Sequence, residues 1–320
     1  MLKFGILADI QYAPIDDGYS FSGTPRYYRH SLSTAGVAAS HFQSENVDFA
    51  INIGDTIDGK CAETASKALG EVCDKLLEYK GEWYGVIGNH ELYNFGRERW
   101  GGSISDVGDK QGINCEVKEE EGSGELVGYY SFDRGDFRFV VLDCYDITSL
   151  DRPVSTSAKG REAKIILDIN PNDDKNSPVG LKDDERRYVA FNGAIGTIQM
   201  DWIRKTLEDS QRNSLNVIII SHVPFYPPVA PNATTLCWNY SDVLSLLGEF
   251  DCVKVCCSGH THNSAHKRDP ESGIQHFVFA AALESPPPIH TYAMITLSKE
   301  CIEVQGYGDE EGRTGKYELK

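Results

Sequence analysis

The stretch FAINIGDTID, residues 49–58, joins a short apolar run to a glycine and two carboxylates. The run is mostly apolar rather than alternating, which predicts a strand covered on both faces. Gly54 lets the backbone turn sharply where the strand ends, because glycine tolerates conformations that other residues avoid. Asp55 follows at once. A carboxylate there could cap a helix, or it could bridge two cations.

Four other motifs with carboxylate, amide or imidazole side chains also follow β-forming runs. In chain order they are Asp9-Ile-Gln11, Gly88-Asn89-His90-Glu91, Ser221-His222 and Gly259-His260-Thr261-His262. Cations of intermediate hardness such as Mn²⁺ accept mixed carboxylate, carbonyl and imidazole ligands. Repeated placement at strand ends favours a metal site over a helix cap for Asp55.

Between the motifs, strand-like and helical runs alternate. The sequence predicts strands at 4–8, 47–53, 83–87, 137–142, 217–220, 253–257 and 277–281, and helices at 28–43, 61–79, 199–210 and 241–250. This order predicts an α/β sandwich with functional loops at strand ends. Two polar segments, 99–128 and 149–196, interrupt it. We expect them to be surface insertions in one domain of residues 1–320, either bordering the site or remote from it.

Composition restricts the partners. The formal net charge of -17 over 320 residues disfavours nucleic acid and anionic membranes as binding partners. The sequence has no run of 18 apolar residues, so we expect no membrane span. Nine cysteines without regular spacing favour a reducing compartment. We therefore expect a cytoplasmic protein, and a monomer, that acts on a small-molecule nucleotide.

The five motifs resemble those of the calcineurin-like metallophosphoesterase superfamily. Its pattern is Asp-x-His, Gly-Asp-x-x-Asp, Gly-Asn-His-Glu/Asp, a lone His and then Gly-His-x-His, and all five blocks occur in order across residues 9–262. The run 195–203 also resembles a Gln-x-x-Trp-Leu helix start that is common in this superfamily. The resemblance implies a four-layer αββα sandwich of two mixed sheets with helices outside.

The resemblance also implies a ligand set for two divalent cations. One ion would be held by Asp9, Gln11, Asp55 and His262, and the other by Asp55, Asn89, His222 and His260. Asp55 would bridge the ions, and His90 would act on the substrate phosphate or the leaving group. Asp58 would orient a ligand imidazole.

Gln11 departs from the superfamily pattern, which usually has His there. An amide oxygen is a harder ligand than imidazole, so Gln11 should favour Mn²⁺ over Zn²⁺, although Zn²⁺ or Mg²⁺ could occupy the site. With this departure the chain resembles the manganese-dependent ADP-ribose/CDP-alcohol diphosphatases. That family implies hydrolysis of ADP-ribose, CDP-choline and CDP-glycerol through attack by a metal-bridging hydroxide, giving a nucleoside monophosphate and a phosphorylated sugar or alcohol.

Aromatic residues on the loops after the first and fourth motifs could hold a nucleoside base. We expect base contacts from Phe21, Cys237 and Trp238, with packing of the loops as the alternative. Other functions remain open from the sequence: phosphoprotein phosphatase, cyclic-nucleotide phosphodiesterase, a cysteine-nucleophile enzyme, or a scaffold that has lost catalysis. The cysteine route is disfavoured because no Cys-x₅-Arg loop occurs. The scaffold is disfavoured because all four motif histidines remain.

Overall fold

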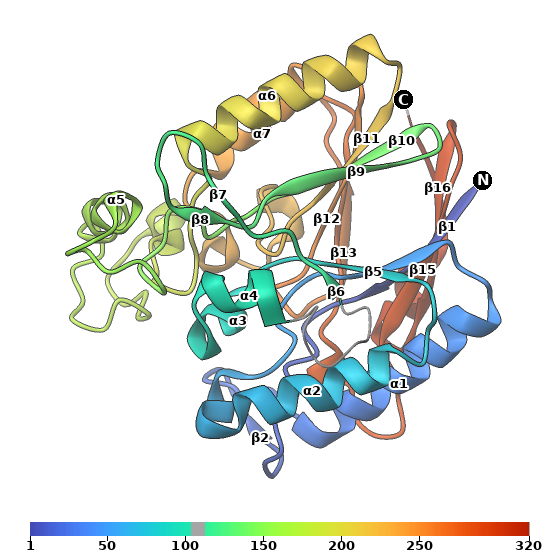
Figure 1. The fold of residues 1–320 in the computed structure, drawn as a ribbon, viewed down its shortest axis with the longest axis horizontal. Helices are drawn as coiled ribbons and strands as arrows, with labels where there is room; N and C mark the ends of the chain where they lie inside the picture. The colour runs from blue at the N-terminus through green and yellow to red at the C-terminus, as the bar shows by residue number, and fades with distance from the viewer. Residues whose placement is uncertain (104–112, 320) are drawn as a thin grey trace.

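Two β-sheets lie face to face in the computed structural model, which describes residues 1–103 and 113–319 (Figure 1). Within these ranges, the larger sheet has the strand order β17 (Gly315–Glu318), β16 (Cys301–Tyr307), β15 (Tyr292–Leu297), β1 (Leu2–Leu7), β4 (Phe49–Asn52), β5 (Glu82–Gly85) and β6 (Ile113–Asn114). The second sheet has the order β13 (Ala265–Arg268), β14 (Gln275–Val278), β12 (Val253–Ser258), β11 (Asn216–Ile220), β10 (Phe137–Val141) and β9 (Tyr130–Arg134).

Both sheets are mixed. Strands β1, β4, β5 and β6 are parallel neighbours, whereas β15 pairs with β1 antiparallel. Strands β10, β11, β12 and β14 are likewise parallel, and β9 and β13 are antiparallel additions at the two edges. Parallel strands end on the same side of a sheet, so the loops that follow them gather at one edge. Two short hairpins stand apart from the main sheets: β2 (Gly18–Tyr19) with β3 (Pro25–Arg26), and β7 (Lys118–Glu119) with β8 (Leu126–Val127).

The core between the sheets is rich in aromatic rings. Phe4 and Phe49 stack with ring centroids 5.1 Å apart, and Phe139 of the second sheet meets Phe49 edge-on, also at 5.1 Å. Ile51 and Ile220, one from each sheet, are fully buried in the same cluster. Burial of such side chains contributes roughly 1.5–3 kcal/mol each. The apolar runs of the sequence therefore form strands because both of their faces are covered.

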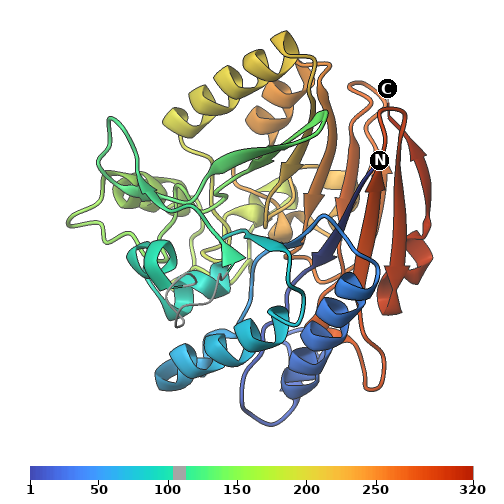
Figure 2. The same cartoon turned by 45° about the vertical axis from the view of Figure 1, so that its right-hand side comes forward.

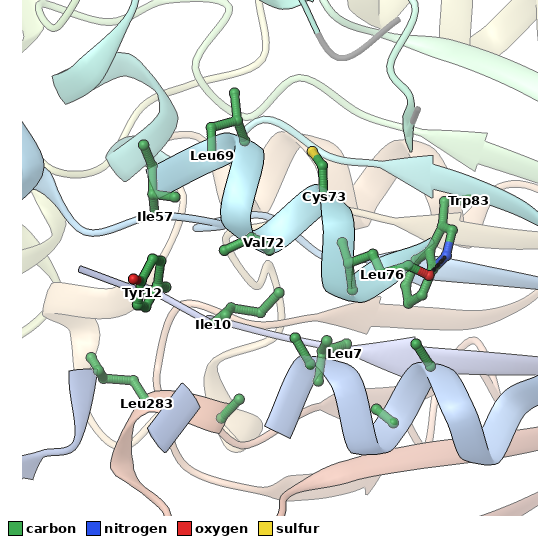
Figure 3. Packing of buried hydrophobic residues seen from close by; sticks show 14 of the residues in the cluster. Leu7, Ile10, Tyr12, Ile57, Leu69, Val72, Cys73, Leu76, Trp83 and Leu283 are labelled. Atoms are coloured by element: carbon green, nitrogen blue, oxygen red, sulfur yellow. Dashed lines mark hydrogen bonds between the residues drawn. The ribbon is translucent and has the colours of Figure 1, made fainter. Parts of the chain in front are cut away.

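Helices cover the outer faces of the two sheets (Figures 1 and 2). On the larger sheet lie α1 (Tyr28–Ser44) and α2 (Ala65–Leu76); Figure 3 shows Val72 and Leu76 of α2 on the side of the helix that faces Ile10 and Leu7. On the second sheet lie α6 (Thr197–Arg212) and α7 (Tyr240–Gly248). The predicted four-layer arrangement is thus confirmed.

Three further helices and several 3₁₀ turns complete the described chain. The helices are α3 (Asn89–Asn94), α4 (Arg97–Ser103) and α5 (Ala158–Leu167). The 3₁₀ turns are η1 (Gly59–Thr64), η2 (Asp183–Arg187), η3 (Pro227–Val229), η4 (Ala233–Thr235), η5 (Ala282–Glu284) and η6 (Gly308–Arg313).

Each predicted strand and helix is present, with shifted bounds. The helix predicted at 61–79 begins only at Ala65, because the preceding residues form η1, with Ala62 at a φ of 45°. Strands β6, β9, β13, β15 and β16 of the two sheets were missed. In β16 the buried Ile302 and Val304 alternate with exposed Glu303 and Gln305, a two-residue period that a search for continuous apolar runs overlooks.

The two predicted insertions have structure of their own. Segment 99–128 contains the end of α4 and the β7–β8 hairpin, while its residues 104–112 lie outside the described residues. Segment 149–196 contains α5 and η2. None of the helices described is long and apolar enough to span a membrane. All nine cysteines fall within the described ranges and are free thiols.

Candidate active site

The five motifs meet where the two sheets adjoin. Asp9 and Gln11 follow β1, Asp55 follows β4, and Asn89 opens α3 after β5. His222 follows β11 of the other sheet, and the His260-Thr-His262 pair follows β12. All five strands run parallel to a neighbour within their sheet, so their carboxyl ends lie on one side. The predicted convergence at strand ends is therefore present, with contributions from both sheets.

Left-handed backbone is concentrated at this site. Nine non-glycine residues of the described chain have positive φ, and five of them are predicted ligands: Asp9 (48°), Gln11 (41°), Asp55 (57°), His260 (66°) and His262 (62°). Such conformations are uncommon outside glycine and persist only where the surroundings impose them. The fold thus holds these side chains in turns that an unconstrained chain would avoid.

At two motif glycines, neighbouring atoms lie too close to leave room for a side chain. A Cβ atom on Gly88 would lie 2.2 Å from Oδ1 of Asp55, and one on Gly54 would lie 2.7 Å from Nδ1 of His222. Gly54 also has a φ of 92°. The glycines before Asp55 and Asn89 therefore make room for neighbouring site residues as well as turning the chain.

Asp55 lies at the centre of the cluster and is buried. Its Oδ2 accepts a hydrogen bond from Nε2 of Gln11 at 2.9 Å and lies 3.3 Å from Nε2 of His222. Its Oδ1 accepts from the backbone N–H of His90 at 2.9 Å. The Glu91 carboxylate accepts from the Asp55 N–H at 2.7 Å and from the Gly88 N–H at 2.8 Å, which fixes the two motif turns against each other.

The tautomers of three histidines follow from their partners. His222 Nδ1 donates to the carbonyl of Ile53 at 2.7 Å, so in the neutral ring Nε2 is the nitrogen that carries the lone pair. His260 Nε2 donates to Oδ1 of Asn192 at 2.9 Å, which leaves Nδ1 free and 3.3 Å from His222 Nε2. His262 Nδ1 donates to Glu284 at 2.7 Å, and its Nε2 lies 3.5 Å from Oδ1 of Asp9. In each ring the other nitrogen thus points into the cluster, and that of His262 also lies 3.0 Å from Nε2 of Gln11.

This arrangement fits a bound cation. Ligand atoms of Asp9, Asp55 and His222 all lie within 4.8 Å of one another. Nε2 of Gln11 faces Oδ2 of Asp55 and Nε2 of His262, which leaves its buried Oε1 without a hydrogen-bond partner among the described residues; rotation of the amide would turn this acceptor toward a cation and satisfy it. Burial lowers the pKa of His222, but the adjacent Asp55 carboxylate outweighs it and raises this pKa to about 10, so without an ion Nε2 holds a proton that a bound cation would displace. The carboxylate-rich centre therefore favours a positive charge at this point.

Asn89 and His90 are also oriented by neighbours. Oδ1 of Asn89 accepts a hydrogen bond from the Tyr145 hydroxyl at 3.0 Å. The backbone N–H of Gly59 donates to Nδ1 of His90 at 2.9 Å, so the neutral ring carries its proton on Nε2. That Nε2 lies 3.9 Å from Oδ2 of Asp55. Burial lowers the pKa of His90, which favours this neutral form.

Asp58 lies beside His90 rather than beside a predicted ligand imidazole. Its Oδ2 is 3.5 Å from Nδ1 of His90, and its Oδ1 accepts the backbone N–H of Lys60 at 2.9 Å. The residue that does orient a predicted ligand imidazole through a carboxylate is Glu284, which sequence analysis missed. A signal existed, because Glu284 follows the predicted strand 277–281 just as the motifs follow theirs.

Two more contacts were missed and had weaker signals. Tyr145 follows β10, another strand end, but carries no motif. Asn192 comes from the segment 149–196, so this insertion does border the site.

Gln199 of the helix-start motif connects α6 to the loop after β10: its Oε1 accepts the Asp143 N–H at 3.0 Å, and its Nε2 donates to the Asp143 carbonyl at 3.1 Å.

The predicted base-contacting residues lie in different environments. Phe21 is fully exposed at the tip of the β2–β3 hairpin. Cys237 is buried, and its thiol donates to the carbonyl of Gly193 at 3.2 Å. Trp238 is also buried, and its indole N–H donates to the carbonyl of Val189 at 3.2 Å. The burial of Cys237 and Trp238 agrees with the packing alternative and gives no support to their contact with a base. Burial also raises the pKa of Cys237 to about 12, which disfavours a thiolate nucleophile there.

Comparison with known proteins agrees with this geometry. The calcineurin-like phosphoesterase model matches residues 2–264. The manganese-dependent ADP-ribose/CDP-alcohol diphosphatase of Oryza sativa subsp. japonica is 38% identical over 309 residues, which cover 96% of this chain and 91% of that protein. The Homo sapiens protein of the same name is 32% identical over 99% of this chain and 93% of its own length.

A solved structure shows the same architecture. The crystal structure of a dimetal phosphatase from Danio rerio matches with a TM-score of 0.89 and 31% identity, covering 100% of this chain and 98% of that one. The chain therefore belongs to the calcineurin-like phosphoesterase family, and within it to the group that contains the manganese-dependent ADP-ribose/CDP-alcohol diphosphatases.

Proposed function

We propose that this protein is a metal-dependent hydrolase that cleaves the phosphoanhydride bond of ADP-ribose, CDP-choline, CDP-glycerol and related nucleoside diphosphate derivatives. The observation that carries the proposal is the set of three inward-facing imidazoles: His222 faces the Asp55 carboxylate, His262 faces that of Asp9, and His260 faces His222. The nearly full-length similarity to diphosphatases named for these substrates selects the substrate class.

The chain would hold two divalent cations. Asp9, Gln11, Asp55 and His262 would bind one, and Asp55, Asn89, His222 and His260 the other, with Asp55 shared. When bound, such a pair supplies Lewis-acid charge at the phosphate and lowers the pKa of a water. Asn89 contributes a neutral oxygen held by Tyr145, so it adds no negative charge that would repel a diphosphate.

His90 is suited to a role at the substrate. Because Gly59 donates to Nδ1, the ring presents Nε2–H as a donor. That hydrogen can stabilise a phosphate oxygen or pass to the oxygen that leaves as the anhydride bond breaks. The Asp58 carboxylate lies 3.5 Å from the same Nδ1, and its negative charge would stabilise the ring when Nε2–H is polarised by a phosphate oxygen.

Gln11 should set the metal preference. The Gln11→His variant is expected to bind Zn²⁺ more tightly by roughly tenfold, the scale on which a ligand environment shifts metal affinity, and to lose part of its preference for Mn²⁺. The physical reason is that imidazole is a softer ligand than an amide oxygen. Titration of the metal-free protein with each ion, followed by rate measurements at equal metal concentration, tests this. An unchanged Mn²⁺ requirement and affinity in Gln11→His would refute the role of Gln11.

Phe21 should contact the base. Its ring is fully exposed on the β2–β3 hairpin, so it is free to stack. Removal of one stacking contact costs about 1 kcal/mol or more. Phe21→Ala is therefore expected to raise KM for ADP-ribose by about fivefold or more, with little change for an aryl phosphate ester, which has no base. An equal change in KM for both substrates would exclude stacking.

A substrate panel tests the proposal as a whole. ADP-ribose, CDP-choline and CDP-glycerol should be hydrolysed with Mn²⁺ at rates well above those for a phosphopeptide or a cyclic nucleotide. The panel should be repeated with Mg²⁺ and Zn²⁺ at the same concentration. Faster hydrolysis of the phosphopeptide, or of the cyclic nucleotide, would replace the diphosphatase assignment with that activity.

A further inference from the structure

Arg26 lies at the base of the aromatic hairpin, beside the site. It is the last residue of β3, and Gly18 of β2 is its partner across the hairpin. The next residue, Tyr27, donates its backbone N–H to the carbonyl of Leu283 at 2.9 Å. Leu283 immediately precedes Glu284. The base of the hairpin is therefore attached directly to the segment that supports His262.

The guanidinium of Arg26 lies between two carboxylates. Its Nη1 is 3.7 Å from Oδ2 of Asp58, and its Nε is 4.0 Å from Oε1 of Glu284. The Arg26 side chain is only 20% exposed, and that of Asp58 only 2%. Among the described residues, no other lysine or arginine reaches ion-pair distance of either carboxylate. The Arg26 guanidinium is therefore the cation that balances the charge of both carboxylates, Asp58 and Glu284.

Each of these carboxylates faces a different site histidine. Asp58 lies 3.5 Å from Nδ1 of His90, and Glu284 accepts Nδ1–H of His262 at 2.7 Å. The two histidines have different predicted tasks, one at the substrate and one at an ion. Within the described part of the chain, Asp58 Oδ2 and Arg26 Nε have no hydrogen-bond partner, so Arg26 balances charge rather than completing a bidentate pair.

We propose that Arg26 is a positioning residue: it neutralises the Asp58 carboxylate that lies beside the unprotonated Nδ1 of His90, and it holds Glu284 against His262. This proposal rests on the proposed function for the tasks of the two histidines. Without the guanidinium, two largely buried carboxylates would face the site with no permanent cation nearby, and each would turn toward another positive partner. Partners that orient metal-ligand histidines typically change metal affinity or activity by 10–100-fold when they are removed.

The test compares Arg26→Ala with Arg29→Ala. Arg29 is close in sequence but pairs at the surface with Asp16 at 3.1 Å, where both side chains are mostly exposed. Arg26→Ala should weaken Mn²⁺ binding, followed by electron paramagnetic resonance without substrate, by about tenfold or more. It should also lower kcat while KM for ADP-ribose changes little. Arg29→Ala should leave both quantities at the wild-type value.

Three further variants keep the result interpretable. If Arg26→Ala does not fold, Arg26→Gln and Arg26→Lys retain much of the side chain, and Arg26→Lys should recover part of the Mn²⁺ affinity by restoring the charge. In a Glu284→Gln background, the Arg26→Ala change should cost less than in the wild type, because one of its two partners is already neutral. Equal costs in the two backgrounds would contradict the proposal.

Other outcomes overturn the proposal in distinct ways. A higher KM with unchanged Mn²⁺ affinity would make Arg26 a phosphate contact instead. Wild-type Mn²⁺ affinity and kcat in Arg26→Ala would remove any role. Because Mn²⁺ binding is measured without substrate, a wild-type protein that hydrolyses no nucleoside diphosphate derivative would refute the proposed function while leaving this test intact.

Discussion

Asp55→Asn is expected to lower kcat/KM for ADP-ribose by about a thousandfold, corresponding to the several kcal/mol of transition-state stabilisation that a metal site supplies. Both Asp55 oxygens accept hydrogen bonds from N–H groups, one from Gln11 and one from His90. An amide has only one acceptor oxygen, so one of these N–H groups would face an NH₂. The variant also removes the negative charge that two cations would share. Steady-state kinetics at saturating Mn²⁺ would measure the loss.

Asp48→Asn is the matched control. Asp48 lies just before the opposite end of the same strand, β4, where it accepts the exposed backbone N–H of Lys3 at 2.8 Å. This variant should retain wild-type kinetics. Asp55→Asn itself should fold, because Asn tolerates left-handed backbone nearly as well as Asp. An Asp55→Asn protein with more than a tenth of the wild-type kcat/KM would show that Asp55 does not hold the ions.

The second large effect concerns stability. Arg97→Ala is expected to reduce the free energy of unfolding by about 3–5 kcal/mol, the usual cost of removing one partner of a buried ion pair. The buried guanidinium donates to both oxygens of Asp143 at 3.1 Å, and also to Asp151 and to the carbonyl of Tyr145. Burial alone would raise the pKa of Asp143, but Arg97 outweighs it, so this pKa lies below its ordinary value. Urea unfolding at pH 7.5 would measure the effect.

The pH dependence separates lost charge from lost packing. In Arg97→Ala, Asp143 would be buried without its cation, so its pKa should rise above its ordinary value. The stability deficit should then shrink as the pH falls from 7.5 toward 5, because the protonated carboxyl no longer needs a partner. A deficit independent of pH would instead indicate lost packing. Arg204→Ala is the control, because its partner Glu249 is at the surface, and its unfolding midpoint should equal that of the wild type.

Much of the site could be predicted because its chemistry is local in sequence. Asp55, Asn89 and His222 each directly follow a run of β-forming residues, and parallel strands place such residues together. The supporting residues could not be found in this way. Asn192 reaches His260 from a polar insertion, and its position depends on how residues 149–196 pack against the second sheet. Glu284 follows a strand, but only the folded chain shows which histidine it faces.

The central strands of the fold could be predicted, but strands near the sheet edges could not. Continuous apolar runs such as 217–220 identified the central strands, because burial on both faces leaves little choice of residue type. Strand β16 has one buried and one exposed face, so its signal is alternation over few residues and is easily missed. The burial of Cys237 and Trp238 could not be predicted, because an aromatic or thiol side chain on a loop can be buried or can contact a ligand.

The left-handed backbone at the ligands has a consequence for which residues can occupy these positions. Asp, Asn and His adopt this conformation far more readily than other residues with a side chain, so conformational preference and ligand chemistry select the same amino acids at positions 9, 55, 260 and 262. Gln11 is the exception: its φ of 41° is unfavourable for a glutamine. The chain therefore has, at the position where it departs from the Asp-x-His pattern, a residue that its own backbone disfavours. Gln11→His should therefore relieve the unfavourable backbone conformation and stabilise the fold, while it reduces the preference for Mn²⁺. The residue that is better for stability at position 11 is not the one that favours Mn²⁺.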